Sequence, residues 1–235
     1  MGICTYDGDI IMVKLEYKIG DCLELMKELE DNSIDLVLTD IPYNEANRSD
    51  NGLRCLNKSN ADSAVFDMTV LLNELNRVCN GSFYIFCGFQ QFSTIDKYMR
   101  DNEISRRCII WEKTNPSPMN CKYIWVSGVE ICVYGKKKKA TYNGGYQNTV
   151  LKYPNGSSKG HPTQKPVELF KEMVMKSSNE GDLVLDPFLG SGTTLLACKQ
   201  TGRNCIGFEK EPKYEALIRK RAMLDTPDIT TYGSD

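Results

Sequence analysis

Apolar residues follow two different periods along this chain. Some form short continuous runs of the length of a buried strand, and others recur every three or four positions, as in an amphipathic helix. Because the two kinds of segment largely alternate, they predict an α/β domain with a mostly parallel sheet. The predicted strands cover residues 34–39, 81–87, 107–111, 129–134, 183–185 and 204–208, and the predicted helices cover 22–29, 65–79, 166–177, 193–200 and 212–224.

Two of the predicted strands end in similar acidic turns. The first strand leads into Asp40-Ile41-Pro42-Tyr43, and residues 183–185 lead into Asp186-Pro187-Phe188. Ligand sites of open α/β sheets lie beyond the carboxyl ends of the strands. We therefore expect both turns to line one crevice.

Two long segments break the alternation of strands and helices. Residues 44–63 are rich in Asn, Ser and Asp, and residues 136–160 contain four consecutive lysines and three tyrosines. Long loops in a compact domain are usually functional or disordered. We expect a mobile loop at 44–63, a surface loop at 136–160, and a single domain over residues 1–235.

Composition narrows the class of protein. The 235 residues are 41% hydrophobic and 26% charged, which suits one globular domain. They include no apolar run long enough to span a membrane and no signal-peptide pattern, so a cytoplasmic protein without membrane partners is expected. Ten cysteines without a C-x-x-C pair are not a zinc framework, and a single histidine, His161, excludes H-E-x-x-H hydrolysis, so no metal is expected.

The second acidic turn has the pattern of a cofactor site. Gly190 and Gly192 let backbone approach a ligand closely, and a helix starting near Thr193 directs its free N–H groups toward the same place. Glu209 follows Asp186 by 23 residues, a spacing that suits hydrogen bonds to ribose hydroxyls. The sequence lacks the dinucleotide and phosphate-loop glycine patterns, so a phosphate-free nucleoside cofactor is favoured; a glycine-rich turn by itself is equally compatible with a structural role.

The first acidic turn can hold an amine. Pro42 keeps Ile41 extended, which would place the Ile41 carbonyl next to the Asp40 carboxylate, so that two acceptors face one spot. An exocyclic amine has two N–H donors, and Tyr43 offers a face on which a flipped base could stack. A solitary Asp-x-Pro-Tyr is also a serviceable structural turn.

Taken together, these motifs resemble those of the amino-DNA methyltransferases that use S-adenosylmethionine. Residues 186–194, DPFLGSGTT, are similar to the family's cofactor motif, and residues 40–43, DIPY, to its D-P-P-Y acceptor motif. Residues 161–166, HPTQKP, match its H-P-T-x-K-P signature. Weaker similarities occur at Gly20-Asp21-Cys22 and at Trp111-Glu112-Lys113 with Asn115-Pro116, so the resemblance extends from about residue 18 to 222.

The resemblance implies roles for individual residues. The acceptor motif would supply the catalytic residues Asp40, Ile41, Pro42 and Tyr43. S-adenosylmethionine would be bound by Asp21, Cys22, His161, Thr163, Lys165, Asp186, Phe188, Gly190, Ser191, Gly192, Thr193 and Glu209. The histidine ring itself need not act in the chemistry.

Motif order implies the permuted arrangement of the beta class. The acceptor motif precedes the cofactor motif, and the resemblance implies a Rossmann-like, mostly parallel sheet with an antiparallel strand. Asp at the first acceptor position is similar to the adenine-directed form, whereas members acting on the cytosine amine usually carry Ser. Ile41 occupies the position of the first Pro in the family motif. Ile supplies the same backbone carbonyl as Pro, but it makes the turn less rigid.

Charge is distributed unevenly along the chain. The net charge is −2, but residues 106–160 hold ten Lys/Arg against two acidic residues, a local +8 that leaves −10 elsewhere. In the permuted order, residues 136–160 occupy the place of the target-recognition segment. We expect double-stranded DNA as partner, contacted by Lys136, Lys137, Lys138, Lys139, Tyr142 and Asn44, although a lysine run is also typical of a solvated turn.

The function predicted from the sequence is site-specific adenine-N6 methylation of DNA in a bacterial, archaeal or phage-infected cell. A cytosine-N4 or RNA methyltransferase, or a non-catalytic nucleic-acid-binding module on the same scaffold, is the alternative. The short recognition segment also suggests a homodimer.

Overall fold

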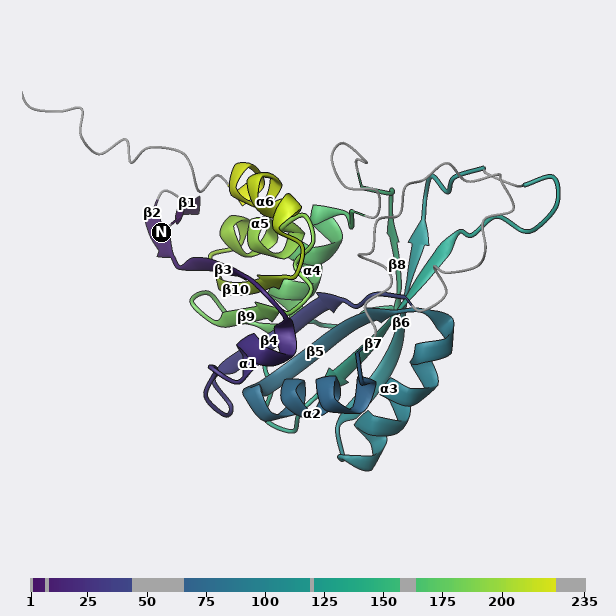
Figure 1. The fold of residues 1–235 in the computed structure, drawn as a ribbon. Helices are drawn as coiled ribbons and strands as arrows, with labels where there is room; N and C mark the ends of the chain where they lie inside the picture. Colours follow the sequence, from purple (N-terminus) through teal and green to yellow (C-terminus); the bar gives the residue numbers. More distant parts are fainter. Residues whose placement is uncertain (1, 7–8, 44–65, 119–120, 157–163, 223–235) are drawn as a thin grey trace, which may run out of the picture.

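The computed structural model describes residues 2–6, 9–43, 66–118, 121–156 and 164–222 (Figure 1). Its centre is an eight-stranded mixed sheet in the order β3-β10-β9-β4-β5-β7-β6-β8, with a separate hairpin of β1 and β2. The strands are β1 (Gly2–Tyr6), β2 (Asp9–Val13), β3 (Leu15–Ile19), β4 (Ile34–Asp40), β5 (Cys79–Cys87), β6 (Ser105–Lys113), β7 (Val129–Lys136), β8 (Val150–Tyr153), β9 (Leu183–Asp186) and β10 (Asn204–Glu209).

Seven of the eight strands run in one direction. Strand β7 is antiparallel to both of its neighbours, β5 and β6, and the other pairings in this sheet are parallel. The predicted mostly parallel sheet with an antiparallel strand is therefore confirmed. Strands β3, β4, β5, β6, β8, β9 and β10 all end at the same side of the sheet, called here the carboxyl end. Strand β7 begins there and finishes at the opposite, amino end.

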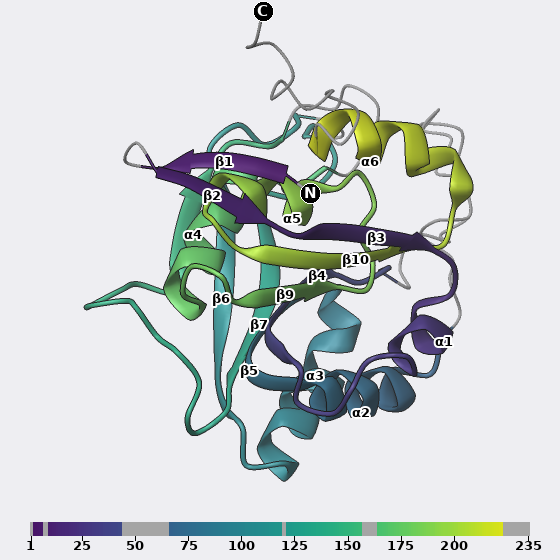
Figure 2. The same cartoon turned by 90° about the vertical axis from the view of Figure 1, so that its left-hand side faces the viewer.

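Helices cover both faces of the sheet (Figures 1 and 2). Apolar residues of α1, α2 and α3 share one buried cluster with the sheet, and those of α4, α5 and α6 share the other. Strand β5 joins both, because Phe83 and Ile85 face the first cluster while Tyr84 and Phe86 face the second. The helices are α1 (Cys22–Met26), α2 (Met68–Val78), α3 (Phe89–Asp101), α4 (Val167–Ser177), α5 (Thr193–Gln200) and α6 (Glu215–Ala222), with a 3-10 turn η3 at Pro212–Tyr214.

Local chemistry explains where the central elements begin. The Asp67 side chain caps α2 by accepting from the Thr69 N–H at 2.8 Å, so this helix starts three residues later than predicted. Where β4 meets β5, a Cβ on Gly81 would lie 1.7 Å from the Asp35 carbonyl oxygen. Only glycine allows the two strands to approach this closely.

Several elements were missing from the prediction. Strand β3, at one edge of the sheet, alternates apolar with charged residues, and α3 buries Ile95 and Met99 on one face, so both carry a periodic pattern that the prediction overlooked. Strand β8, the opposite edge strand, lies inside the predicted 136–160 loop and pairs with β6. Within that range a continuous loop was therefore the wrong expectation. The predicted loop at 44–63 lies outside the described residues, and in the described part no helix is long and apolar enough to cross a membrane.

Candidate active site

The acceptor turn, residues 40–43, leaves the sheet at the carboxyl end of β4. The Ile41 side chain is buried, and its backbone N–H donates to the Phe86 carbonyl at 3.1 Å, which holds the turn against β5. Gln91 donates to the Pro42 carbonyl at 2.9 Å and accepts from the Gly88 N–H at 2.8 Å. The start of α3 therefore stabilises a turn that lacks the first proline of the family motif.

A network of charged side chains lies beneath this turn. The Lys165 ammonium, on a side chain only 6% exposed, contacts Asp40 Oδ2 at 2.5 Å and Glu130 Oε2 at 2.9 Å. Lys113 contacts Glu130 Oε1 at 2.7 Å, and the Tyr43 hydroxyl donates to Glu130 Oε2 at 3.3 Å. Two carboxylates thus face two ammonium groups, and the network is electrically balanced.

Burial and ion pairing act against each other in this network. Burial raises the pKa of Asp40, and the Lys165 ammonium only partly offsets that rise. Burial would also raise the pKa of Glu130, but Lys165 and Lys113 lower it to about 2. Asp40 Oδ1 is buried and, among the described residues, has no hydrogen-bond partner. Because an unsatisfied buried carboxylate oxygen is costly, this atom is a strong candidate acceptor for a substrate N–H.

The Tyr43 side chain shares the Lys165 ammonium with Asp40. Lys165 lies 5.4 Å from the ring centroid on one side, and a Cβ on Gly88 would come within 3.4 Å of Tyr43 Cβ. The ring is thus held by a cation and by close backbone, which leaves it able to present a flat surface to a base.

The glycine turn, residues 186–192, lies at the carboxyl end of the neighbouring strand β9. Gly190 and Gly192 have φ values of 54° and 80°, a left-handed backbone that favours glycine, and α5 begins at the next residue. Asp186 Oδ1 accepts from the Thr39 hydroxyl at 2.8 Å and from the Phe188 N–H at 3.1 Å, and Oδ2 accepts from the Thr194 hydroxyl at 2.5 Å. Asp186 therefore fastens the glycine turn to the residue that precedes Asp40.

Glu209, at the end of β10, completes the glycine turn. Its two oxygens accept from the backbone N–H groups of Gly190 and Glu211, each at 2.8 Å, and burial raises its pKa. Each carboxylate oxygen keeps a second lone pair, so Glu209 can still accept from ligand hydroxyls. Parallel pairing of β3 with β10 brings Gly20 alongside, and the Gly20 N–H donates to the Glu209 carbonyl at 2.8 Å.

The remaining predicted cofactor residues surround this turn in different ways. Asp21 caps α1 and pairs with Lys210 at 3.1 Å, while the Cys22 side chain is buried in the core. The Phe188 ring packs on Phe66 with 5.4 Å between centroids. The hydroxyls of Ser191 and Thr193 lie 3.5 Å apart at the start of α5.

This cradle suits a cofactor with an adenosine moiety and a positive charge. Among the described residues Glu209 has no ion pair, so its charge is open to ligand hydroxyls and to a cation. The start of α5, where the helix dipole has its positive end, suits a carboxylate. Residues 20 and 21, Phe188, Gly190 and Glu209 would hold such a group. Asp186 shapes the turn by accepting from Thr39 and Thr194, and its contact with the cofactor stays a prediction.

Three predicted site residues lie outside the described part of the chain: Asn44, His161 and Thr163. Lys165, expected at the cofactor, is placed by the structure on Asp40. Cofactor contact by Lys165 stays a prediction, but its observed partners belong to the acceptor turn.

The lysine run at 136–139 is not brought to the acceptor turn. Lys136 pairs with Ser82 and Ser105 at the amino end of the sheet, six residues and roughly 20 Å along β7 from Glu130. The Lys137 ammonium donates to the carbonyls of Asn76 and Cys79 at the end of α2, at 2.8 and 2.5 Å. Lys137 therefore stabilises the end of a helix.

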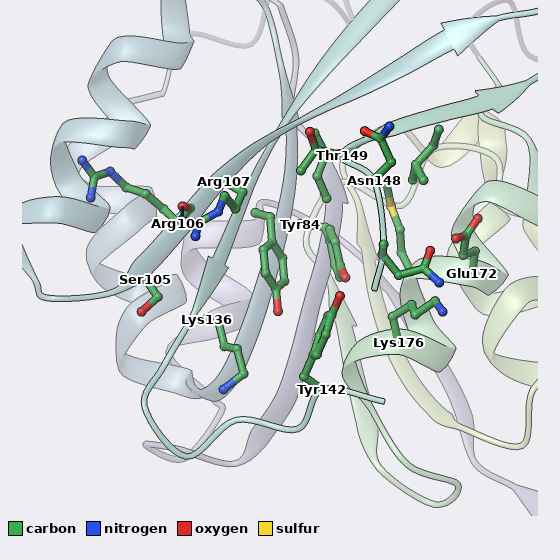
Figure 3. Close-up of a pocket in the computed structure, with 15 residues that line it drawn as sticks. Tyr84, Ser105, Arg106, Arg107, Lys136, Tyr142, Asn148, Thr149, Glu172 and Lys176 are labelled. Atoms are coloured by element: carbon green, nitrogen blue, oxygen red, sulfur yellow. Dashed lines mark hydrogen bonds between the residues drawn. The ribbon is translucent and has the colours of Figure 1, made fainter. Parts of the chain in front are cut away.

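Tyr142 also lies on the side of the lysine run. With Lys136 it lines a cavity of about 340 Å³ between the sheet and α4 (Figure 3). Asn143, next to it, donates its backbone N–H to the Lys176 carbonyl at 2.7 Å, which fixes this segment to the end of α4. DNA contact by the run and by Tyr142 stays a prediction, made for a surface distant from the reacting groups.

Sequence reasoning missed several members of the site. Glu130 and Gln91 contact the acceptor turn, and Thr39 and Thr194 hold Asp186. Glu130 had one signal, because it is one of only two acidic residues in the basic stretch 106–160. The contact of Gln91 with the acceptor turn had none, since the Pro42 carbonyl is 49 residues away along the chain and becomes a neighbour only in the folded protein.

Known proteins with similar sequences match the part of the chain that contains both turns. The model of the N6/N4 DNA methylase family matches residues 34–220, a range that contains the two turns and Glu130. The type II methyltransferase M.HpaI of Haemophilus parainfluenzae is 32% identical over 86% of this chain and 72% of its own length. The type II methyltransferase M2.MboI of Moraxella bovis is 28% identical over 88% of this chain and 87% of its own.

Solved structures give the same picture of the fold. The M1.HpyAVI complex with S-adenosylmethionine superimposes with a TM-score of 0.69 and 28% identity, over 90% of this chain and all of that one. The cytosine-N4-specific PvuII DNA methyltransferase superimposes with a TM-score of 0.73 over 93% of this chain and 89% of its own. Because the two sequences are only 20% identical, this similarity shows the fold alone.

Proposed function

Since the chain belongs to the N6/N4 DNA methylase family, we propose that it transfers a methyl group from S-adenosylmethionine to the N6 amine of a flipped adenine in double-stranded DNA. The observation that carries the proposal is the buried Asp40 Oδ1, which lacks a hydrogen-bond partner among the described residues, on a carboxylate that shares the Lys165 ammonium with the Tyr43 hydroxyl. A neutral amine with two N–H donors is the group that such an oxygen and the Ile41 carbonyl would bind together.

The glycine turn would bind the cofactor and the acceptor turn would bind the target base. The glycine turn and Glu209 hold S-adenosylmethionine, which when bound supplies an electrophilic methyl group on a sulfonium sulfur. Thr39 connects the turns, because its hydroxyl donates to Asp186 while the next residue is Asp40. This short connection fixes the distance between the two sites, and fixed proximity is a large part of the catalysis expected here.

The acceptor turn prepares the nucleophile. Asp40 and the Ile41 carbonyl accept one N–H each, which draws the amine nitrogen out of conjugation and frees its lone pair, while Tyr43 stacks on the base. The Asp40 carboxylate then stabilises the positive charge that develops on the nitrogen. Because burial raises the pKa of Asp40, this carboxylate is also a better acceptor for the proton that the nitrogen loses.

Adenine is preferred to cytosine because Asp occupies the first acceptor position. The overall fold does not separate the two substrates, since the cytosine-N4-specific PvuII enzyme shares it. Analysis of the methylated product separates them. DNA from a methylation-deficient host is incubated with the protein and isotopically labelled S-adenosylmethionine, digested to nucleosides and analysed by mass spectrometry. Labelled N6-methyladenine is expected; labelled N4-methylcytosine would refute the choice of base, and unlabelled DNA would refute the activity.

The Asp40→Ala variant tests the role of the carboxylate. We expect at least a 100-fold loss of methyl transfer, the size typical of a lost charge-stabilising group, with cofactor affinity within about twofold of wild type. Calorimetry measures the cofactor affinity, and Asp101→Ala, which removes an exposed carboxylate of α3, is the control. Unaltered turnover in Asp40→Ala would contradict the proposed role.

A further inference from the structure

Exposed apolar side chains gather on the connection between β6 and β7. Its described part at residues 121–128, called here the aromatic segment, exposes Tyr123 by 86%, Ile124 by 67% and Trp125 by 96%. Another exposed aromatic residue, Phe89, follows the carboxyl end of β5. Large apolar side chains exposed side by side on one segment usually mark an interaction site.

The aromatic segment is built onto the acceptor site. Strand β6 ends at Lys113 and β7 begins at Val129, so the connection leaves and re-enters the sheet at its carboxyl end (Figure 1). The Lys113 N–H donates to the Gly128 carbonyl at 2.8 Å, and the Lys113 ammonium contacts Glu130, which in turn contacts Lys165. The base of the segment is therefore part of the network that holds Asp40.

Chain length limits how far the segment can reach. Trp125 is five residues from Glu130, so their Cα atoms are at most roughly 18 Å apart. A DNA duplex is about as wide as this distance, so a duplex with a base in the acceptor turn must pass close to the segment. Lys122 is the only charged residue between 114 and 129, so no acidic group there repels phosphate.

Resting on the proposed function, we propose that the aromatic segment contacts the DNA at the target base, with Trp125 and Tyr123 stacking into the space that the flipped base leaves. Stacking of this kind is sequence-tolerant and is strong enough to offset part of the unstacking cost. The segment would thus act in positioning the substrate, and Asp40 and Tyr43 would remain the groups that touch the reacting base.

A second copy of the chain is the competing occupant of this surface. A stable dimer buries roughly 800 Å² per partner, which is more than a few side chains on one connection provide. Coverage by a second copy would also obstruct the side of the sheet from which a base must reach Asp40. The location of the segment therefore favours DNA.

The test uses the full-length protein with Trp125→Ala, Tyr123→Ala and the double variant. Met175→Ala is the control, because Met175 is also an exposed apolar residue but lies on α4, outside both the aromatic segment and the predicted recognition segment at 136–160. Affinity for duplex DNA, taken from the wild-type modification site and carrying 2-aminopurine at the target position, is measured by anisotropy, and flipping by 2-aminopurine fluorescence. Calorimetry with S-adenosylmethionine checks that the cofactor site is intact.

We expect Trp125→Ala to weaken DNA binding roughly 10- to 100-fold and to reduce the flipping signal, with cofactor affinity unchanged. An abasic site opposite the target should restore much of the flipping. Wild-type DNA affinity and flipping in the double variant, or an equal loss in Met175→Ala, would overturn the inference. So would a dimer, seen by light scattering, that Trp125→Ala dissociates without changing DNA affinity.

This design separates the inference from the proposed function. Methyl transfer by the wild type tests the function, whereas the ratio of variant to wild-type DNA affinity tests the aromatic segment. Loss of DNA binding in Trp125→Ala would support the segment's role even for a protein that transfers its methyl group to another base.

Discussion

At the acceptor turn, Asp40 and Glu130 are held by the ammonium groups of Lys165 and Lys113, whereas at the glycine turn Asp186 and Glu209 are held by hydroxyls and backbone N–H groups. The two turns lie on neighbouring parts of one sheet, and burial raises the pKa of Asp40 at the one and of Asp186 and Glu209 at the other; Glu130, which two lysines contact, is the exception. Lysines lower the pKa of Glu130 to about 2, while burial raises the pKa of Asp186 to about 6.

This difference matches the charge of what each turn is proposed to bind. A neutral amine needs acceptor oxygens whose charge is already balanced, so that binding buries no net charge. A sulfonium cofactor carries a positive charge, and carboxylates without a lysine partner attract it. The balanced network and the uncompensated one are therefore complementary parts of a single site.

The largest effect is expected from removing the cation of the acceptor turn. Lys165→Met leaves Asp40 and Glu130 without their shared partner, and breaking a buried pair in this way costs about 3–5 kcal/mol of stability. Methyl transfer at neutral pH should fall at least 100-fold, because the pKa of Asp40 rises further once the lysine is gone. Urea unfolding and a pH profile of activity measure the two effects.

Lys210→Met is the control for that experiment, since Lys210 pairs with Asp21 on the surface, where a salt bridge contributes little. If Lys165→Met unfolded at the same urea concentration as wild type and kept its activity, the balanced network would have no role in holding Asp40.

A smaller and more selective effect is expected from the glycine turn. Glu209→Gln removes the charge and one of the acceptors used by the Gly190 and Glu211 N–H groups. Affinity for S-adenosylmethionine should fall roughly 10- to 100-fold, the size of a lost hydrogen bond to a charged group. Turnover at saturating cofactor should stay within a few-fold of wild type. Calorimetry and steady-state kinetics separate these quantities, and the neighbouring Glu211→Gln is the control; a changed turnover with unchanged affinity would contradict the assignment.

The two turns are also expected to differ in how they affect the pH dependence of stability. The pKa of Asp186 is about 6 in the folded protein and 3.8 for an ordinary Asp, so its contribution to stability is complete below pH 3.8 and is lost as the pH rises to 6. The change is on the order of 3 kcal/mol. Asp186→Asn should flatten this part of the stability profile, measured by urea unfolding between pH 4 and 6.5.

The contribution of Glu130 to stability should change with pH in the opposite direction. Its folded-state pKa is about 2, below the ordinary 4.5, so its contribution is present above pH 4.5 and is lost as the pH falls. Glu130→Gln should therefore flatten the profile between pH 5 and 3. Identical profiles for the two variants would remove the distinction between the turns.

The sequence predicted the strands that carry the site and both acidic turns, because a buried strand followed by a proline or glycine turn has a strong local signature. It missed Gln91 and Glu130, whose partners lie 49 and 35 residues away at Pro42 and Lys165. It also favoured Lys136–Lys139 for DNA, because a run of charge is visible locally, whereas the end of the sheet at which the run lies is not.

Local patterning and motif order were sufficient to determine the fold class, the family and the residues of the two turns. Which groups neutralise Asp40, which end of the sheet faces the substrate, and which aromatic side chains remain exposed there were decided only by the tertiary structure. The physical reason lies in β7. Its antiparallel direction brings Glu130 to the acceptor turn and carries Lys136 to the opposite end, and strand direction depends on pairing with β5 and β6 rather than on the residues of β7 alone.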